Sequence, residues 1–208
     1  GYGSTSGIQL RGLPKRYSTV YIDGVKQYDP GSPSGDFDFS TILKDQISRV
    51  EILRGNQSSV YGSGAMGGTI NITTKKGKPG FQKNVNATTG TNGTHNLALS
   101  MSGANKKNDF YLGLERFVTE GISAMSDNNE RDGYDNNTLA GSYGYKITDK
   151  IKLENSLRYM IANTEFDTVS RTTSRALHDD DEQKQDEFSL NTSLLFNLNE
   201  QFSNRLTF

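Results

Sequence analysis

The chain has 208 residues, of which 32% are hydrophobic, and its mean hydropathy is −0.68. No segment approaches the roughly 20 consecutive apolar residues that a membrane-spanning helix requires, which excludes a helical membrane protein. The net charge of −1 gives no electrostatic footprint for nucleic acid, and the absence of cysteine excludes disulfides, cysteine-ligated metals and thiol nucleophiles.

Short apolar segments separated by glycine and proline make up residues 1–80. The pattern predicts strands at 8–12 and 17–22, the second closed by the turn signal Asp23-Gly24. A loop is predicted over 28–41, and one short helical turn is predicted over 42–47.

Residues 49–76 form the most informative stretch, RVEILRGNQSSVYGSGAMGGTINITTKK. Its alternation predicts a half-buried strand that ends at Gly55 and a second strand over 69–74. The glycine-rich segment between them allows positive φ angles or close backbone approach. A phosphate-binding loop is disfavoured because no lysine followed by serine or threonine is present and no helical pattern follows. The pattern alone is therefore equally typical of a structural hairpin.

From residue 81 the sequence changes to successive hairpins. Period-two alternation predicts seven strands, at 83–91, 95–103, 109–118, 138–147, 151–162, 188–198 and 202–208. Their apolar faces include Leu97, Leu112, Tyr143, Leu157 and Phe196. Short connections alternate with long polar ones at 119–137 and 165–187, as in outer-membrane barrels with short turns at one end and long loops at the other. A soluble β-sandwich binding module, the alternative of another class, has no reason for this asymmetry.

Over residues 8–77 the chain resembles the plug domain of TonB-dependent outer-membrane receptors, which presents an Arg-Val-Glu strand, an Arg-Gly-Pro turn, a Tyr-Gly loop and an Asn-Ile-Thr strand in this order. The residues that carry the resemblance are Arg49, Glu51, Gly55, Tyr61, Gly62, Gly67, Gly68 and Asn71. Asn56 stands where the family usually has proline, so the turn lacks proline's fixed φ.

The resemblance implies an all-β chain with a small α/β plug. Residues 1–80 would be the C-terminal part of the plug, and residues 81–208 would be the first seven strands of a 22-stranded antiparallel barrel. We expect the chain to be a fragment, because the first half of the plug and its TonB-binding box would precede residue 8.

The same resemblance implies energy-coupled uptake of a scarce nutrient across the bacterial outer membrane, with no enzymatic activity. The expected partners are membrane lipid, the nutrient and the TonB–ExbB–ExbD complex. The segment DFDFSTILKDQISRVEILRG and the acidic segment near residue 130 resemble the vitamin B12 receptor branch, which favours a cobalamin-like ligand over a ferric siderophore or haem. The residues that bind the nutrient are not indicated.

Two arginines, Arg11 and Arg54, each end a predicted plug strand and precede a glycine. They are ordinary strand-end charges by pattern alone. In the receptor family the matching arginines face glutamates of the barrel wall, so the resemblance predicts a plug–barrel lock, meaning a buried ion pair between the two parts. The glutamates would lie beyond Phe208.

Catalytic patterns are absent from the sequence: His95 and His178 have no ligand-spaced partners, and no nucleophile elbow occurs. Acidic residues are usually solvated when they gather in loops. Carboxylate oxygens also suit Ca²⁺, although the spacing here is not that of an EF-hand. The resemblance to the vitamin B12 receptor, whose external loops are ordered by calcium, implies a structural calcium site and no other cofactor. Its candidate ligands are Asp127, Glu130, Asp132, Asp135, Asp179, Asp180 and Asp181.

Overall fold

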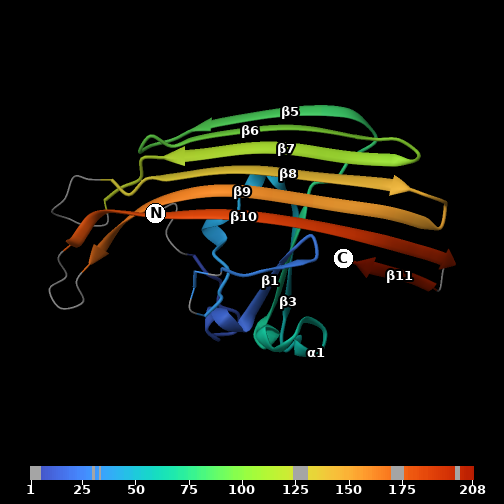
Figure 1. The fold of residues 1–208 in the computed structure, drawn as a ribbon, viewed down its shortest axis with the longest axis horizontal. Helices are drawn as coiled ribbons and strands as arrows, with labels where there is room; N and C mark the ends of the chain where they lie inside the picture. The colour runs from blue at the N-terminus through green and yellow to red at the C-terminus, as the bar shows by residue number, and fades with distance from the viewer. Residues whose placement is uncertain (1–5, 30, 33, 124–130, 170–175, 200–201) are drawn as a thin grey trace.

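A computed structural model describes residues 6–29, 31–32, 34–123, 131–169, 176–199 and 202–208. The chain forms two sheets: a small sheet with the strand order β2-β1-β4-β3 and a large sheet with the order β11-β10-β9-β8-β7-β6-β5. The small sheet lies against one face of the large sheet, and its strands run across those of the large sheet (Figure 1). None of the helices in the described ranges is long enough to span a membrane.

The small sheet contains β1 (Ser18–Ile22), β2 (Val25–Gln27), β3 (Ile47–Arg54) and β4 (Gly68–Thr74). The β1–β2 hairpin turns at Asp23-Gly24, as predicted, with φ angles of 49° and 88°. Strand β4 pairs parallel to β1 and antiparallel to β3. The short helices of this part are η1 (Lys15–Tyr17), η2 (Phe39–Thr41), η3 (Lys44–Gln46), α1 (Ser58–Tyr61) and η4 (Ser63–Ala65).

An apolar core holds the small sheet together. Alternation along β1 and β4 places β-branched residues on one face, where they are almost completely buried. The buried members of this core are Leu10, Val20, Ile22, Phe37, Ile70 and Ile72. Phe39, Ile42 and Ile47 cover its margin, so the segment that links β2 to β3 closes the core.

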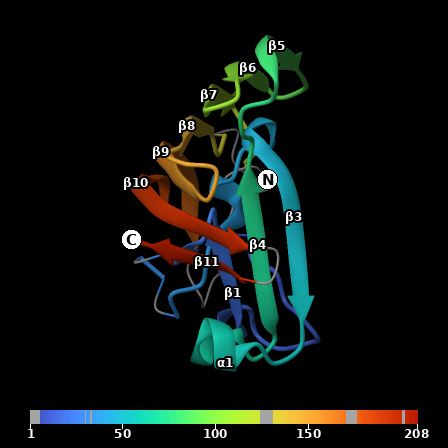
Figure 2. The ribbon, with the colours of Figure 1, turned by 90° about the vertical axis from the view of Figure 1, so that its right-hand side faces the viewer.

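Three details of this part differ from the predictions. The predicted strand at 8–12 is a turn, because Arg11 and Gly12 both have positive φ and Leu13 N–H bonds to Leu10 O. Strand β3 is an edge strand, so Val50 and Ile52 are about half exposed rather than on a buried face. The glycine-rich segment contains the single helical turn α1, which lies at the end of β3 farthest from β5 (Figure 2).

The large sheet contains seven strands, which confirms the predicted number, and all neighbours are antiparallel. The strands are β5 (Gly80–Thr89), β6 (His95–Ala104), β7 (Asn108–Thr119), β8 (Tyr134–Lys146), β9 (Ile151–Val169), β10 (Ala176–Asn199) and β11 (Phe202–Thr207). Strand β5 follows β4 directly, so the two sheets join at residues 75–79. We call the end of the sheet that carries the 120–133 connection the loop end.

The two faces of the large sheet have opposite chemistry. Leu97, Leu112 and Tyr143 are 48%, 39% and 46% exposed on the outer face. Leu157 and Phe196 lie on the same face by strand register and are half-buried. The inner face, toward the small sheet, carries mostly small or polar side chains, with one apolar cluster of Tyr134, Met160 and Ala162 packed against Phe117. The predicted alternation of faces is confirmed.

The prediction of a polar loop over 165–187 is wrong, because β9 and β10 continue through most of it. Their pairing extends past Glu182↔Glu165 to Ala176↔Val169. Strand β8 ends its pairing with β9 at Tyr134↔Thr164, so the outermost part is a two-stranded ribbon. Both faces of such a ribbon are free of the sheet, and polar side chains are therefore compatible with a strand there. Strand β8 likewise begins inside the predicted loop 119–137.

Candidate functional site

The inner face of the large sheet is a polar surface that the small sheet covers. Its side chains come from alternate positions of β6 to β10, as strand periodicity requires. Those buried to more than nine-tenths are Asn96, Glu115, Thr119, Asn136, Thr138, Ser142, Arg158, Asn191 and Ser193. A polar interior face with an apolar exterior face is typical of a barrel wall in an outer membrane.

One polar junction forms where the η2 helix meets β8 and β9. The Thr41 carbonyl accepts hydrogen bonds from Asn136 Nδ2 and from an Arg158 guanidinium nitrogen, both at 3.1 Å. The Tyr134 hydroxyl donates to the Ser40 carbonyl at 3.0 Å. These bonds attach the backbone of residues 6–79, here called the small unit, to the inner face of the large sheet. Because both acceptors are backbone carbonyls, neither position requires a particular side chain.

A buried ion pair anchors this junction. Arg158 on β9 and Glu187 on β10 are 2.9 Å apart, with side chains only 6% and 20% exposed. Because both charges are removed from water, each depends on the other for compensation. The guanidinium group therefore joins the β9–β10 hairpin to the small unit through Thr41.

A second polar junction lies near the opposite ends of the strands. Lys76, two residues beyond the end of β4, pairs with Glu154 at 2.9 Å. Lys152 bridges Glu154 and Asp109, each at 2.9 Å. Nearby, Asn191 Nδ2 donates to the Asp23 carbonyl. An ion pair thus connects the two sheets at residues 75–79, in addition to the covalent link of the chain.

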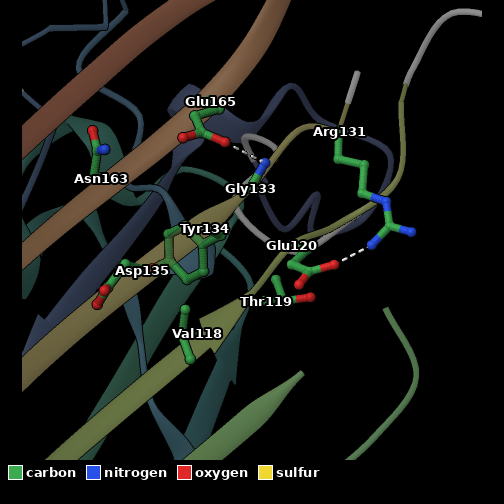
Figure 3. A pocket seen from close by; sticks show the side chains of 9 residues that line it. All are labelled: Val118, Thr119, Glu120, Arg131, Gly133, Tyr134, Asp135, Asn163 and Glu165. Carbon is green, nitrogen blue, oxygen red and sulfur yellow. Dashed lines mark hydrogen bonds and ion pairs between the residues drawn. The ribbon is translucent and has the colours of Figure 1, made fainter. Parts of the chain in front are cut away.

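An open cavity of about 680 Å³ lies at the loop end of β7, β8 and β9. Figure 3 shows Arg131 paired with Glu120 at its margin and Glu165 accepting from the Gly133 N–H, at 3.0 Å. Its lining also includes Tyr134, together with Val118, Thr119, Asp135 and Asn163. The cavity offers both charge signs and an aromatic ring, and it adjoins the Ser40 junction through Tyr134.

A second cavity of about 390 Å³ separates the small sheet from β8, β9 and β10. Tyr21 and Tyr61 contribute rings 5.2 Å apart, and the opposite wall contributes small polar side chains such as Ser156 and Ser193. Burial, followed by the neighbouring Tyr61 ring, raises the pKa of the Tyr21 hydroxyl. The contact between the two sheets is therefore incomplete and polar in this region.

The predicted arginines of the plug–barrel lock lie at one end of the small unit. Arg11 and Arg54 are both exposed, and the Arg11 guanidinium lies near Gly55. Strand β3 ends with Arg54 on the side away from the large sheet (Figure 2). The two arginines are thus brought together, and the predicted barrel glutamates stay a prediction.

The predicted motif residues surround the turn between β3 and β4. Arg49 and Glu51 of β3 form an ion pair at 2.8 Å, and Glu51 also lines the inter-sheet cavity. Gly55, Gly62 and Gly68 have φ angles of 103°, 84° and 150°. At Gly68 a Cβ atom would lie 2.4 Å from the Leu53 carbonyl oxygen, so this position requires glycine.

The other three motif residues lie beside that turn. The Gly67 N–H bonds to Tyr17 O at 2.8 Å, which closes the loop onto β1. Tyr61 and Asn71 both line the inter-sheet cavity. These eight positions therefore act as structural elements of one turn and one sheet face.

The candidate calcium ligands are only partly placed. Asp127 and Glu130 lie outside the described residues, as do the side chains of Asp179 and Asp180. Asp135 pairs with Arg116 at 2.8 Å. Asp132 lies in sequence between Arg131 and Gly133, which both line the 680 Å³ cavity, and Asp181 lies in β10. Within the described ranges no group of three or more His, Cys, Asp or Glu is arranged to hold a metal ion, and the calcium site stays a prediction.

Sequence reasoning missed the junction residues Thr41, Asn136 and Arg158. The available signal was a long charged side chain at an inward position of a barrel-like strand, since such a charge needs a buried partner. The partner Glu187 was hidden because residues 165–187 were interpreted as a loop.

The chain is similar in sequence to a known protein family and to a named transporter. Residues 1–69 match the family model "TonB-dependent Receptor Plug Domain". The chain is 30% identical over 171 residues to the vitamin B12 transporter BtuB of Photobacterium profundum, which covers 80% of this chain and 28% of the relative. The chain thus spans less than a third of that relative's length.

Solved structures share the fold at low identity. The siderophore receptor PirA from Acinetobacter baumannii has a TM-score of 0.73 at 16% identity, covering 95% of this chain and 32% of its own. The ferric yersiniabactin uptake receptor FyuA from Yersinia pestis has a TM-score of 0.70 at 18% identity, covering 92% of this chain and 32% of its own. These likenesses concern the fold alone.

Proposed function

This chain belongs to the TonB-dependent receptors of the bacterial outer membrane, and from this premise we propose that the whole protein imports a cobalamin-like nutrient. Residues 1–80 are assigned to the plug and residues 81–208 to the first barrel strands. The chain is not an enzyme, in keeping with relatives that are transporters and receptors. Membrane lipid would surround the outer face of the large sheet. The TonB–ExbB–ExbD complex would supply the energy for transport.

The observation that carries the choice of ligand is the 30% identity to a vitamin B12 transporter over 171 residues. The siderophore receptors match at 14–19% identity, a level that supports only the shared fold. A ferric siderophore remains the alternative ligand, since these receptors resemble the chain over more than nine-tenths of its length. Haem is the other member of that alternative class.

We infer that the cavity at the loop end of β7 to β9 forms part of the nutrient-binding surface. It lies where long connections gather, and binding residues of rigid scaffolds are commonly found on such loops. Arg131 and Glu120 can meet polar groups of a ligand, and Tyr134 provides an apolar surface. A large, polar nutrient with an apolar macrocycle fits this combination.

Titration of the full-length receptor with cyanocobalamin, ferric siderophores and haem tests the proposal. We expect cyanocobalamin to bind at least about tenfold more tightly than the iron ligands, a difference of about 1.4 kcal/mol. Arg131→Ala is expected to weaken binding, whereas Lys146→Ala, an exposed cation at the opposite end of β8, serves as the control. Preferential binding of a ferric chelate or haem would replace cobalamin with the alternative ligand class.

A calcium requirement is the second expected property. Asp132 and Asp135 stand at the start of β8, close to the Arg131–Glu120 pair, and a divalent ion there would offset repulsion among carboxylates. A chelator should weaken nutrient binding, by up to a hundredfold if the ion is present at about a hundredfold excess over its Kd. Asp132→Asn should reproduce the loss without chelator. Equal affinity with and without calcium would leave these residues as solvated acids.

A further inference from the structure

A half-buried carboxylate of the plug, that of Asp45 in the η3 helix, meets the barrel wall. Asp45 accepts hydrogen bonds from Asn86 Nδ2, at 3.0 and 3.1 Å to its two oxygens. Asn96 Nδ2 donates to the same carboxylate at 3.1 Å. Donors from β5 and β6 thus supply both oxygens of Asp45.

A second carboxyl group, Glu115 on β7, lies against Asp45 and Asn96, and one of its two oxygens has no donor. Its side chain is only 4% exposed and is in contact with both Asp45 and Asn96. Glu115 Oε2 has no hydrogen-bond partner, and neither has Asn96 Oδ1, although Asn96 is only 7% exposed. Two neighbouring buried side chains therefore each keep one acceptor oxygen without a donor.

No cationic side chain in the described part of the chain forms an ion pair with either carboxyl group. None of the ion pairs among the described residues includes Asp45 or Glu115. The other titratable group near Glu115 is Tyr111 of its own strand, and the groups from β5 and β6 are the neutral amides. Two like charges in contact, one of them buried, are unfavourable, and a bound cation or a proton would relieve the repulsion.

One added proton would give both unpaired oxygens, Glu115 Oε2 and Asn96 Oδ1, a hydrogen-bond partner. Placed on Glu115 Oε2, it converts an acceptor into a donor for Asn96 Oδ1 and removes the repulsion from Asp45. A calcium ion would need six to eight oxygens, more than these two carboxylates and one amide carbonyl supply. We propose that Asp45 of the plug and Glu115 of the barrel wall form a proton-binding site that is occupied only while the plug is seated.

The proposal gives the plug a defined response to pH. When the plug leaves the wall, Asp45 moves away and water reaches Glu115, so the proton is released. The seated state therefore binds one more proton than the released state, and its stability falls as the pH rises. Linkage of one proton limits the change in the seated-to-released ratio to about tenfold per pH unit.

The test measures plug seating in the full-length receptor, reconstituted in lipid vesicles and without nutrient. Hydrogen exchange of residues 36–46 and passive ion conductance are recorded from pH 5 to pH 9. We expect protection to fall and conductance to rise with pH in the wild type. Glu115→Gln, whose amide donates to Asn96 at every pH, should keep the plug seated with no pH dependence, and Asp45→Asn should flatten the response.

Matched controls separate this site from general effects of charge. Glu182→Gln removes an exposed carboxylate of β10 and should retain the wild-type pH response. A flat wild-type profile, or a Glu115→Gln profile that follows the wild type, would overturn the proposal. Loosening of the plug by a chelator at constant pH would instead identify a metal site and also overturn it. Because nutrient is absent, failure here is distinguishable from failure of the cobalamin assignment.

Discussion

Replacing Arg158 with methionine should destabilise the full-length receptor by about 3–5 kcal/mol, because Glu187 would be left buried without its partner. The Thr41 carbonyl would also lose one of its two donors, so the contact between plug and wall should weaken. The free energy of unfolding, measured by denaturant titration in lipid vesicles, provides the test.

The structure supplies a control with the same chemistry and different burial. Arg116 and Asp135 form an ion pair at 2.8 Å whose side chains are 62% and 33% exposed, so Arg116→Met should cost less than about 1 kcal/mol. Adding Glu187→Gln to Arg158→Met should restore much of the lost stability, since no buried charge would remain unpaired. Equal losses for the two arginine variants would contradict the assigned role of burial.

Lysine at Leu114 should lower stability by about 2–4 kcal/mol, because this residue lies near the middle of β7 on the outer face. Leu114 is 52% exposed, and its register neighbours on that face are Leu99 and Leu139. A charged group at mid-bilayer depth cannot be hydrated without deforming the membrane. Folding of each variant into lipid vesicles measures the loss.

Two further lysine variants separate the effect of membrane depth from the effect of the sheet face. Val118→Lys alters the same face of the same strand near its loop end, where the cost should fall to about 0–1 kcal/mol. Ser100→Lys lies on the inner face, opposite Gly113, and should be tolerated better than Leu114→Lys. Similar losses at all three positions would be inconsistent with a lipid-facing outer surface.

The sequence was sufficient to predict the large sheet because alternation there is determined by one apolar and one polar environment. The hairpin turn at Asp23-Gly24 was equally local, since two residues with positive φ specify it. Residues 165–187 were misinterpreted because this segment is strongly polar in sequence, and polarity alone does not separate a solvated ribbon from a loop.

The candidate sites depend on pairings that sequence does not provide. Arg158 and Glu187 are brought together by the register of β9 and β10, and Asp45 meets Glu115 only when η3 docks on the wall. The strand predicted over residues 8–12 failed for another reason. Arg11 adopts a positive φ, an uncommon state for a residue with a side chain, and tertiary contacts of Leu10 offset its cost.

The parallel pairing of β1 with β4 carries a cost in chain entropy that the large sheet avoids. Thr19 and Thr69, which share a hydrogen bond, are separated by 50 residues, whereas each hairpin of the large sheet closes a much shorter segment. A tenfold longer closure costs about 2 kcal/mol more. Full burial of one Ile or Val side chain offsets about that amount, so the small core around Ile70 determines whether this sheet remains closed. The plug is therefore a unit whose closure depends on a few apolar side chains, beside a wall whose hairpins form from local contacts.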